Sequence, residues 1–262
     1  MTYSMGGNDR IILQARDLHL LRELAVMRVV DREQAKIVAG FASTSRANVR
    51  LLALTNAGML RRFFLGSGGG RKALYVLSSK GAQAAQVPSR GPRRPQDAVL
   101  VADYFVGHQL AVNAIYCALK HCPIPPQMTF HRWQSFHEPV VPGIRLIPDG
   151  YVELVTPKGI TACFLEADLG HESQKIWRRK VEHYVELALS GKFREHFGYE
   201  RFRVLVLANS ERRLHSIKKT ASAITQKIFW FATLGSVQSD FFAPVWFRPG
   251  ENQPTKLFET PP

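Results

Sequence analysis

Apolar residues recur at helical spacing in three successive stretches near the N-terminus of the chain. In the first stretch, Leu18, Leu21 and Leu24 lie on one predicted helix face. Residues able to cap a helix precede the other two stretches, and a glycine follows the last. The helices are predicted over residues 16–27, 32–41 and 45–58, with Asp31 capping the second, Ser43 or Thr44 capping the third, and Gly58 ending it.

A β-rich stretch over residues 59–78 follows the third helix. Two strand-like runs flank a glycine-rich turn at residues 66–70. Three helices followed by a hairpin is the layout of a winged helix-turn-helix. In that fold one helix enters the major groove and the hairpin contacts the phosphate backbone. The pattern therefore predicts a DNA-binding domain over residues 1–87.

Basic and hydroxyl side chains lie beside the apolar positions of this domain. Arg46 and Arg50 are one helical turn apart, so both are expected to face the same groove. Arginine binds guanine bidentately or grips phosphate, and basic residues of a wing neutralise phosphates. The alternative is a solvated basic helix face beside a flexible loop. The candidate DNA-binding residues are Ser43, Ser45, Arg46, Arg50, Arg61, Arg62, Arg71 and Lys72.

A proline- and arginine-rich segment at residues 88–97 interrupts the pattern and is predicted to be a basic linker. The pattern beyond it alternates between strand-like and helical stretches, which predicts a mixed sheet flanked by helices over residues 98–262. The fold class is therefore α+β with two domains. Helices are expected over 103–121, 173–189 and 221–231, and strands within 128–141 and over 145–155, 161–168, 202–208 and 245–247.

The composition narrows the class of protein. The 262 residues are 45% hydrophobic, enough to build the cores of two domains. Lys and Arg number 35 against 21 Asp and Glu, a net charge of +14, which favours a nucleic-acid partner. Residues 1–90 hold 14 of these basic residues and 5 acids, so the first third carries most of the excess charge.

Three cysteines without a Cys-x-x-Cys pair exclude a disulfide framework and a cysteine zinc site, and favour a reducing compartment. The sequence shows neither a signal peptide nor an apolar run long enough to span a membrane. We therefore expect a cytoplasmic protein with no membrane partner.

Four charged side chains mark a candidate metal site in the second domain. Asp149 lies at a Pro-Asp-Gly bend, while Glu166 and Asp168 are two residues apart and share one strand face. Lys180 lies on the apolar side of the next helix and needs a carboxylate partner. Carboxylates from neighbouring strands can hold Mg²⁺, which activates water for attack on a phosphodiester.

The hypothetical metal ligands are Asp149 and Glu166, and the hypothetical catalytic residues are Asp149, Glu166, Asp168 and Lys180. The three carboxylates are expected to converge around a positive charge, which is either a divalent ion or the ammonium of Lys180. The alternative is a plain acid–lysine contact between a strand and a helix, beside a common type of turn.

Several segments resemble the replication-relaxation family of plasmid and mobile-element proteins. They include ARDLHLLRELAVMRVVDREQAKIV, HQLAVNAIYCAL, RLIPDGYVEL and FLEADLGHES, and the resemblance covers roughly residues 15–210. It implies a winged-helix DNA-binding domain and a role in the replication or relaxation of plasmid DNA.

The second domain is also similar to the PD-(D/E)XK nuclease superfamily, which implies a restriction-endonuclease-like fold. Pro148 and Asp149 match the first part of the motif, and Glu166 matches its acidic residue. Asp168 stands where the motif has lysine, and Lys180 would supply the amine from the helix. The resemblance implies a Mg²⁺-dependent nuclease or an inactive relative that binds DNA or a partner.

These observations favour a double-stranded DNA-binding protein of a plasmid or mobile element that controls replication, transfer or transcription. DNA binding would need no cofactor, and Mg²⁺ would be needed only by an active nuclease-like site. The alternatives are a Mg²⁺-dependent DNA endonuclease and a protein-interaction adaptor, and Asp168 favours the binder. The expected partners are duplex DNA, a second copy of the chain, and a replication or transfer protein.

Overall fold

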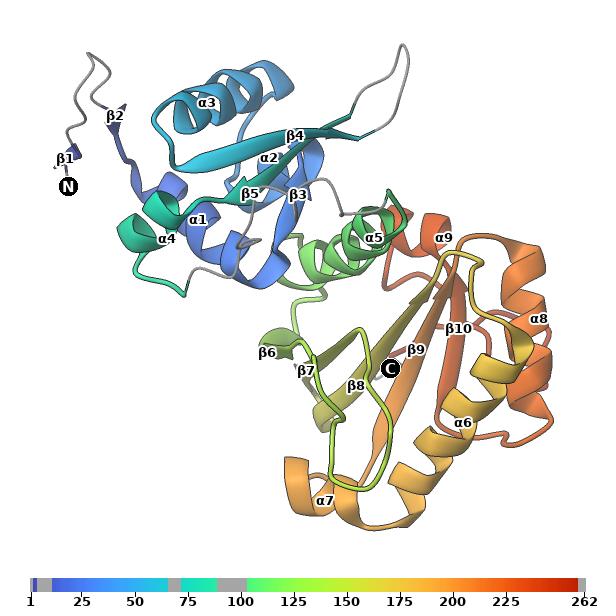
Figure 1. Cartoon of the computed structure of the whole chain (residues 1–262). Coiled ribbons are helices and arrows are strands. Elements are labelled where there is room, and N and C mark those ends of the chain that lie inside the picture. Colours follow the sequence, from blue (N-terminus) through green and yellow to red (C-terminus); the bar gives the residue numbers. More distant parts are fainter. Residues whose placement is uncertain (1, 4–10, 66–71, 89–102, 259–262) are drawn as a thin grey trace. The chain divides into compact units, whose positions relative to one another are not determined.

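The computed structural model describes residues 2–3, 11–65, 72–88 and 103–258 (Figure 1). By its internal contacts the chain divides into two compact units, Met1–Cys117 and Ala118–Pro262. The elements of the N-terminal unit are β1 (Thr2–Tyr3), β2 (Ile11–Ile12), α1 (Ala15–Met27), β3 (Val29–Asp31), α2 (Arg32–Val38), α3 (Thr44–Asn56), β4 (Leu60–Leu65), β5 (Lys72–Leu77), α4 (Ser79–Ala85) and most of α5 (Asp103–Lys120). Those of the C-terminal unit are β6 (Thr129–Gln134), β7 (Gly150–Thr156), β8 (Gly159–Asp168), α6 (Gln174–Leu189), α7 (Lys192–Phe197), β9 (Phe202–Ala208), α8 (Glu211–Ser222), β10 (Phe229–Thr233) and α9 (Leu234–Ser239).

The N-terminal unit contains the three predicted helices, α1 to α3, followed by the predicted hairpin of β4 and β5. Strand β3, which the sequence analysis did not predict, pairs with β5 and completes a three-stranded antiparallel sheet in the order β3-β5-β4. The tip of the hairpin at residues 66–71, including Arg71, lies outside the described residues.

Local signals fix the ends of α2 and α3. The side chain of Asp31 accepts a hydrogen bond from the backbone N–H of Gln34 at 2.8 Å, as expected for the cap of α2. Ser43 caps α3 in the same way, with 3.3 Å between its Oγ and the backbone nitrogen of Arg46. Gly58 has a φ of +74° directly after α3, a conformation that glycine adopts without strain.

Helix α5 packs mainly within the N-terminal unit, whereas the sequence analysis assigned it to the second domain. The Asn113 side chain donates hydrogen bonds to the carbonyls of Met27 and Val29, at 3.0 and 2.6 Å. The hydroxyl of Tyr116 donates to the carboxylate of Glu23 at 2.6 Å. These hydrogen bonds pair polar groups of α1 and β3 with side chains of α5, so α5 completes the N-terminal unit.

The boundary between the units accordingly falls after Cys117 and not within the predicted linker at residues 88–97. Most of that linker lies outside the described residues. The apolar face of α5 carries no sign of which unit it covers, so the sequence alone could not place it. None of the helices in the described ranges, α5 included, is both long and apolar enough to cross a membrane.

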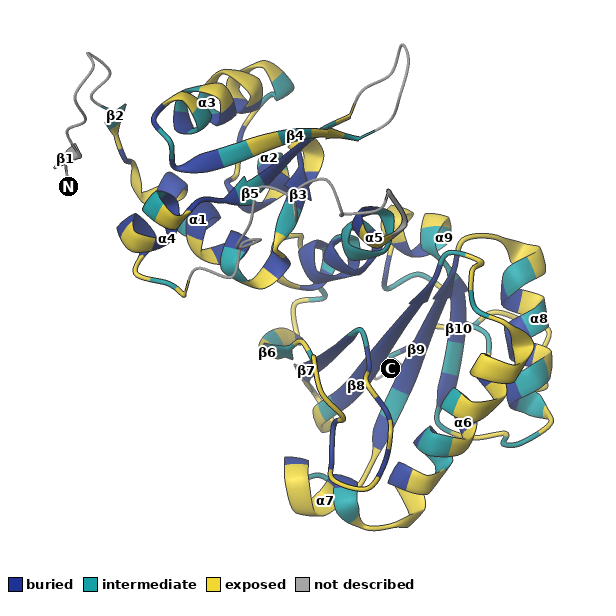
Figure 2. Cartoon of the chain, in the orientation of Figure 1, coloured by how far each residue is buried: buried dark blue, intermediate teal, exposed yellow. Residues whose placement is uncertain are grey.

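The C-terminal unit is built on a five-stranded sheet in the order β10-β9-β8-β7-β6. Strands β6, β7 and β8 pair antiparallel, whereas β8, β9 and β10 pair parallel. Helices α6 and α8 pack side by side over one face of this sheet, and their outer sides are exposed while the central strands are buried (Figure 2). The predicted mixed sheet flanked by helices is therefore confirmed.

The helix predicted over residues 221–231 is wrong. Ser210 caps α8, which ends at Ser222, and the chain then forms strand β10 in parallel register with β9. Alternate residues Phe229 and Phe231 point into the core, which is the pattern of a strand. The apolar residues of β10 fit a helix as well as a strand in the sequence, because short apolar runs are compatible with both structures.

Candidate nucleic-acid interface and acidic cluster

Helix α3 buries one side in the N-terminal unit and exposes the other. Ala47, Leu51 and Leu54 are fully buried, as the apolar spacing predicted. The opposite side presents polar and apolar groups together, and Val49 is 70% exposed. The exposed residues along α3 are Ser45, Arg46, Asn48, Val49, Leu52 and Asn56.

Asn48 and Val49 were not among the predicted DNA-binding residues, because that prediction followed basic side chains. An asparagine can bind adenine bidentately, and an apolar side chain can contact the methyl group of thymine. The exposed fraction of each position on α3 identifies these two residues.

Arg50 does not share the exposed side of α3 with Arg46. Its Nε donates to Oδ1 of Asp17 at 3.0 Å, a second N–H binds the other oxygen of the same carboxylate, and it also donates to the carbonyl of Ile12 at 2.7 Å. The hydrogen bond to Asp17 raises the pKa of Arg50, against the opposing effect of burial. Asp17 is fully buried, so the pair ties α3 to the start of α1. This geometry conflicts with the predicted role of Arg50 in reading bases.

Ser43, Ser45 and Arg46 lie together at the N-terminal end of α3. Ser43 caps α3, and Ser45 and Arg46 follow it in the exposed first turn. In the described part of the chain, the Arg46 side chain has no carboxylate partner. Its guanidinium is therefore available to an external anion.

The hairpin carries two of the predicted arginines on β4. The guanidinium of Arg61 lies 5.1 Å from the ring centre of Phe63, and that of Arg62 lies 5.2 Å from the ring centre of Phe64. Such cation–π contacts hold each side chain along the strand without neutralising its charge. Phe64 itself is 53% exposed, so this surface combines positive charge with aromatic area.

Lys72 forms an ion pair with Asp31, with 2.5 Å between Nζ and Oδ2. The lysine side chain is half exposed, whereas Asp31 is buried. Contact of Lys72 with a phosphate would therefore compete with its ion pair to Asp31.

Glu166 lies on the face of β8 that α6 covers, and it is fully buried. One carboxylate oxygen accepts from Nζ of Lys180 at 2.8 Å, and the other accepts from the hydroxyl of Tyr184 at 2.7 Å. Lys180 also binds Glu172, at 2.7 Å. The predicted pairing of Lys180 with a carboxylate of the adjacent strand is confirmed.

The protonation of this pair is shifted by its surroundings. Burial raises the pKa of Glu166 to about 7, against the opposing effect of Lys180, and the charge of Asp149 raises it further. Burial acts to lower the pKa of Lys180, but Glu166 and the other nearby carboxylates outweigh it, so this pKa is raised. Lys180 is therefore the positive charge that the acidic side chains surround.

Asp168 shares the covered face of β8 with Glu166 but binds a different cation. Its two oxygens accept from Nε and Nη2 of Arg213 on α8, at 2.9 and 2.7 Å. The Trp177 indole N–H and the Gly170 backbone N–H also donate to it. Burial acts to raise the pKa of Asp168, but these donors together lower it. The expected convergence of three carboxylates is therefore wrong, because Arg213 holds Asp168 in a separate ion pair.

Asp149 connects the start of β7 to β8. Its Oδ2 accepts from the backbone N–H of Ala167 at 2.7 Å, and its own backbone N–H donates to the carbonyl of Leu165 at 3.1 Å. The Pro-Asp-Gly bend thus fixes the register of the two strands. This is the structural role that such a turn commonly has.

The carboxylates do not fit a Mg²⁺ site as they stand. Glu166 and Asp168 are buried and have both oxygens occupied by protein donors, and Asp149 binds a backbone amide. Among the described residues of the C-terminal unit taken alone, no three His, Cys, Asp or Glu side chains are close enough to hold a metal ion. We therefore derive no metal-dependent step from this cluster.

Replacing Lys180 with methionine should destabilise the protein more at pH 8 than at pH 5, by about 1–3 kcal/mol at the higher pH. Because the folded pKa of Glu166 is raised, its contribution to stability is present below its ordinary pKa of about 4.3 and is lost as the pH rises through about 7. Loss of Lys180 removes the cation that pairs with the ionised form of Glu166. The stability of the variant should therefore fall more steeply as the pH rises. Urea unfolding at both pH values measures it.

The control is Lys175→Met, an exposed lysine on the same helix, which should change stability equally little at both pH values. Equal losses at pH 5 and pH 8 in the Lys180 variant would contradict the assigned ion pair.

The fold and these sites define an α+β protein with a helix-and-hairpin unit and a second unit built on a mixed sheet. A family model described as Replication-relaxation matches residues 18–200, which is most of the chain. The protein therefore belongs to the replication-relaxation family, as its resemblance to that family predicted.

No curated protein matches the chain in sequence. Among solved structures, the restriction endonuclease FokI is similar at 12% identity with a TM-score of 0.32, over 90% of this chain and 45% of that chain. The chain thus spans less than half the length of that structure.

Proposed function

We propose that this protein binds duplex DNA through its N-terminal unit, acting as a winged helix. Membership of the replication-relaxation family supports a role in replication and mobile elements. The finer proposal is that DNA binding controls replication, transfer or transcription of a plasmid, phage or integrated element. The observation that carries it is the exposed side of α3, where Arg46 and Asn48 lie beside Val49 without a protein element covering them in the described part of the chain.

The order of the elements supports this docking. In a winged helix-turn-helix the second helix of the pair lies in the major groove, and the hairpin follows the backbone. Here α3 supplies polar groups suited to base edges, and β4 supplies Arg61 and Arg62 for phosphates. Base reading then falls to Asn48 and Val49, with Arg46 placed for a phosphate or a guanine.

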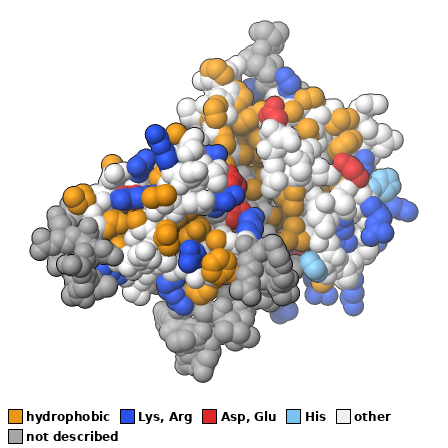
Figure 3. Space-filling view, turned by 90° about the horizontal axis from the view of Figure 1, so that it is seen from above, with side chains coloured by type: hydrophobic (Ala, Val, Ile, Leu, Met, Phe, Trp, Pro, Cys, Tyr) orange, Lys and Arg blue, Asp and Glu red, His pale blue; other side chains and the backbone are white. Residues whose placement is uncertain are grey.

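Electrostatics favours the same partner. The first 90 residues carry 14 Lys and Arg against 5 acids, so the N-terminal unit attracts polyanions over a distance. On the face shown in Figure 3, Lys and Arg side chains are far more frequent than Asp and Glu side chains. DNA affinity is therefore expected to fall steeply with salt concentration.

For the C-terminal unit we propose a nuclease-like fold that serves binding instead of cleavage. Both buried carboxylates of β8 are paired with cations from α6 and α8, so neither is placed to meet a phosphodiester. This domain would dock a replication or transfer protein, or a second copy of the chain, while the N-terminal unit holds the DNA.

The test divides the chain after α5. A fragment of residues 1–120 should bind duplex DNA with nearly the affinity of the whole protein, and a fragment of residues 121–262 should bind weakly. Fluorescence anisotropy over a salt series measures both. A fragment of residues 1–90 is the control, because it lacks Asn113 and Tyr116 and so loses the hydrogen bonds that these residues make to α1. It should therefore be less stable than the 1–120 fragment.

Two outcomes would contradict the proposal. Equal affinity of the 121–262 fragment and the whole chain would move DNA binding to the sheet domain. Cleavage of duplex DNA by the pure protein with Mg²⁺, abolished by Glu166→Ala, would make the protein a nuclease.

A further inference from the structure

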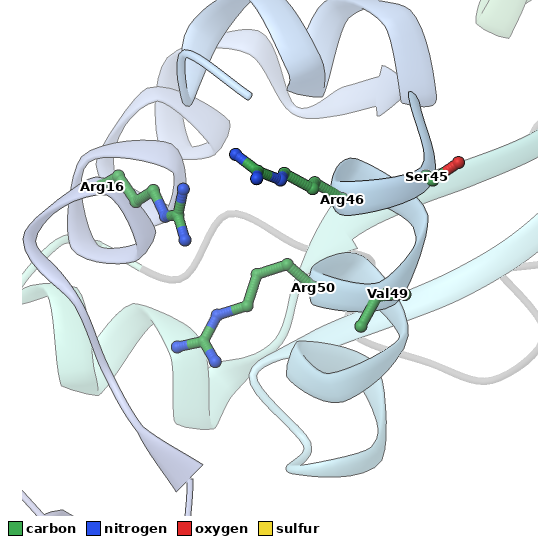
Figure 4. Close-up of a pocket in the computed structure, with 5 residues that line it drawn as sticks. All are labelled: Arg16, Ser45, Arg46, Val49 and Arg50. Carbon is green, nitrogen blue, oxygen red and sulfur yellow. The ribbon is translucent and has the colours of Figure 1, made fainter. Parts of the chain in front are cut away.

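An open pocket of about 430 Å³ lies in the N-terminal unit where α1 and α3 face each other (Figure 4). Three arginines line it, one from α1 and two from α3. Figure 4 shows the guanidinium groups of Arg16 and Arg46 directed toward the same space from opposite sides. The complete lining is Arg16, Ser45, Arg46, Val49 and Arg50.

Within the described residues, the positive charge of this pocket is not fully balanced. Asp17 neutralises Arg50 through a bidentate ion pair, but it offers nothing further, since both of its oxygens are engaged. Neither Arg16 nor Arg46 has a carboxylate partner within the described ranges of the chain. Two like charges that share a pocket repel each other, so an anion between them would relieve an unfavourable arrangement.

Arg16 is also held in position. Its guanidinium lies 5.1 Å from the ring centre of Phe41, which is buried between α2 and α3. A planar group fixed on a ring loses less freedom on binding than a mobile lysine would. Two such forks can bind the oxygens of one tetrahedral anion with charge-assisted hydrogen bonds.

We propose that this pocket binds a single phosphodiester of the DNA backbone, clamped between Arg16 and Arg46. The inference rests on the proposed function and extends it, because Arg46 lines both the pocket and the exposed side of α3. With α3 in the major groove, the pocket meets the phosphates at the edge of that groove. Arg16 then fixes the register of α3 on the duplex without reading sequence.

The experiment compares Arg16→Gln, Arg46→Gln and the double variant of the full-length chain by fluorescence anisotropy on duplex DNA at several salt concentrations. The matched control is Arg22→Gln, which removes the same charge from the same helix. Arg22 donates to the carbonyl of Ala85, toward α4 and away from the pocket. Thermal melts establish that all four variants are folded.

Loss of the clamp should weaken binding about tenfold in the double variant, as expected for a charge-assisted hydrogen-bonded contact. Because the two arginines share one phosphate, the double variant should lower the slope of log affinity against log salt by about 0.9. Each single variant should lower that slope by less, since the remaining arginine still contacts the phosphate. The Arg22 variant should match the wild type.

Three results would overturn the clamp. An Arg16 variant that behaves like the Arg22 variant would remove Arg16 from the interface. A double variant whose slope falls by about 1.8 would assign the arginines to separate phosphates. If the double variant kept the DNA affinity and salt slope of the wild type, while inorganic phosphate raised the melting temperature of the wild type but not of the double variant at constant ionic strength, the pocket would be a site for a free anion.

The clamp and the proposed function fail in distinguishable ways. If the wild-type chain does not bind duplex DNA at any salt concentration, the proposed function is wrong. If the wild type binds and only the effect of Arg16 is absent, DNA binding stands and the clamp is wrong.

Discussion

Replacing Arg50 with alanine is expected to cost about 3–5 kcal/mol of the free energy of unfolding, because the change strands a buried carboxylate. Asp17 is fully buried and receives two hydrogen bonds from Arg50. Among the described residues, the remaining donor to its carboxylate is the backbone N–H of Gln14, at 2.7 Å, which cannot compensate for a lost guanidinium. Urea unfolding of the full-length chain measures the loss.

Arg46→Ala is the matched control on the same helix, one turn earlier. Its side chain is exposed and has no carboxylate partner in the described residues, so stability should be unchanged while DNA affinity falls. The two variants should thus separate the role of Arg50 in folding from the role of Arg46 in DNA binding. Equal loss of stability in both variants would contradict the assignment of Arg50 to the Asp17 pair.

Much of the N-terminal unit could be predicted from the sequence, because its signals are local. The caps Asp31 and Ser43, the buried positions Ala47 and Leu51, and the positive φ of Gly58 all act within a few residues. Such signals place helices α2 and α3 independently of the rest of the fold.

The functions of Arg46 and Arg50 could not be separated in this way. The two residues are one turn apart and chemically identical, so periodicity puts them on the same stripe of the helix. What distinguishes them is Asp17, which is 33 residues from Arg50 along the chain and reaches it only through tertiary packing. The same limit hid Arg16, whose pocket exists only once α1 and α3 are packed.

The two ion pairs of the acidic cluster also differ in whether the sequence could predict them. The partnership of Glu166 with Lys180 was predictable, because a strand and the helix that follows it pack together, and the residues are 14 positions apart. The partnership of Asp168 with Arg213 spans 45 positions, and the helix predicted over residues 221–231 did not include Arg213, which lies on α8. Asp168 was therefore assigned to the wrong cation.

Arg213→Ala should also cost about 3–5 kcal/mol of the free energy of unfolding at neutral pH. Asp168 is almost fully buried and Arg213 supplies two of its hydrogen bonds, while Arg213 also donates to the backbone carbonyl of Glu172. Arg212→Ala, at the exposed neighbouring position, is the control and should leave stability unchanged. Urea unfolding at pH 7 compares the two.

The pH dependence of the Arg213 variant separates loss of the ion pair from loss of packing. In the wild type the pKa of Asp168 is lowered, so its stabilising contribution is present above the ordinary aspartate pKa of about 3.9 and is lost as the pH falls. In the Arg213 variant, the N–H groups of Trp177 and Gly170 still oppose the effect of burial on the pKa of Asp168, but the guanidinium does not. The ionised carboxylate of Asp168 therefore destabilises the folded state. The deficit should therefore be largest near pH 7 and shrink toward pH 4, where Asp168 takes up a proton. A deficit that stays constant over this range would assign the role of Arg213 to packing alone.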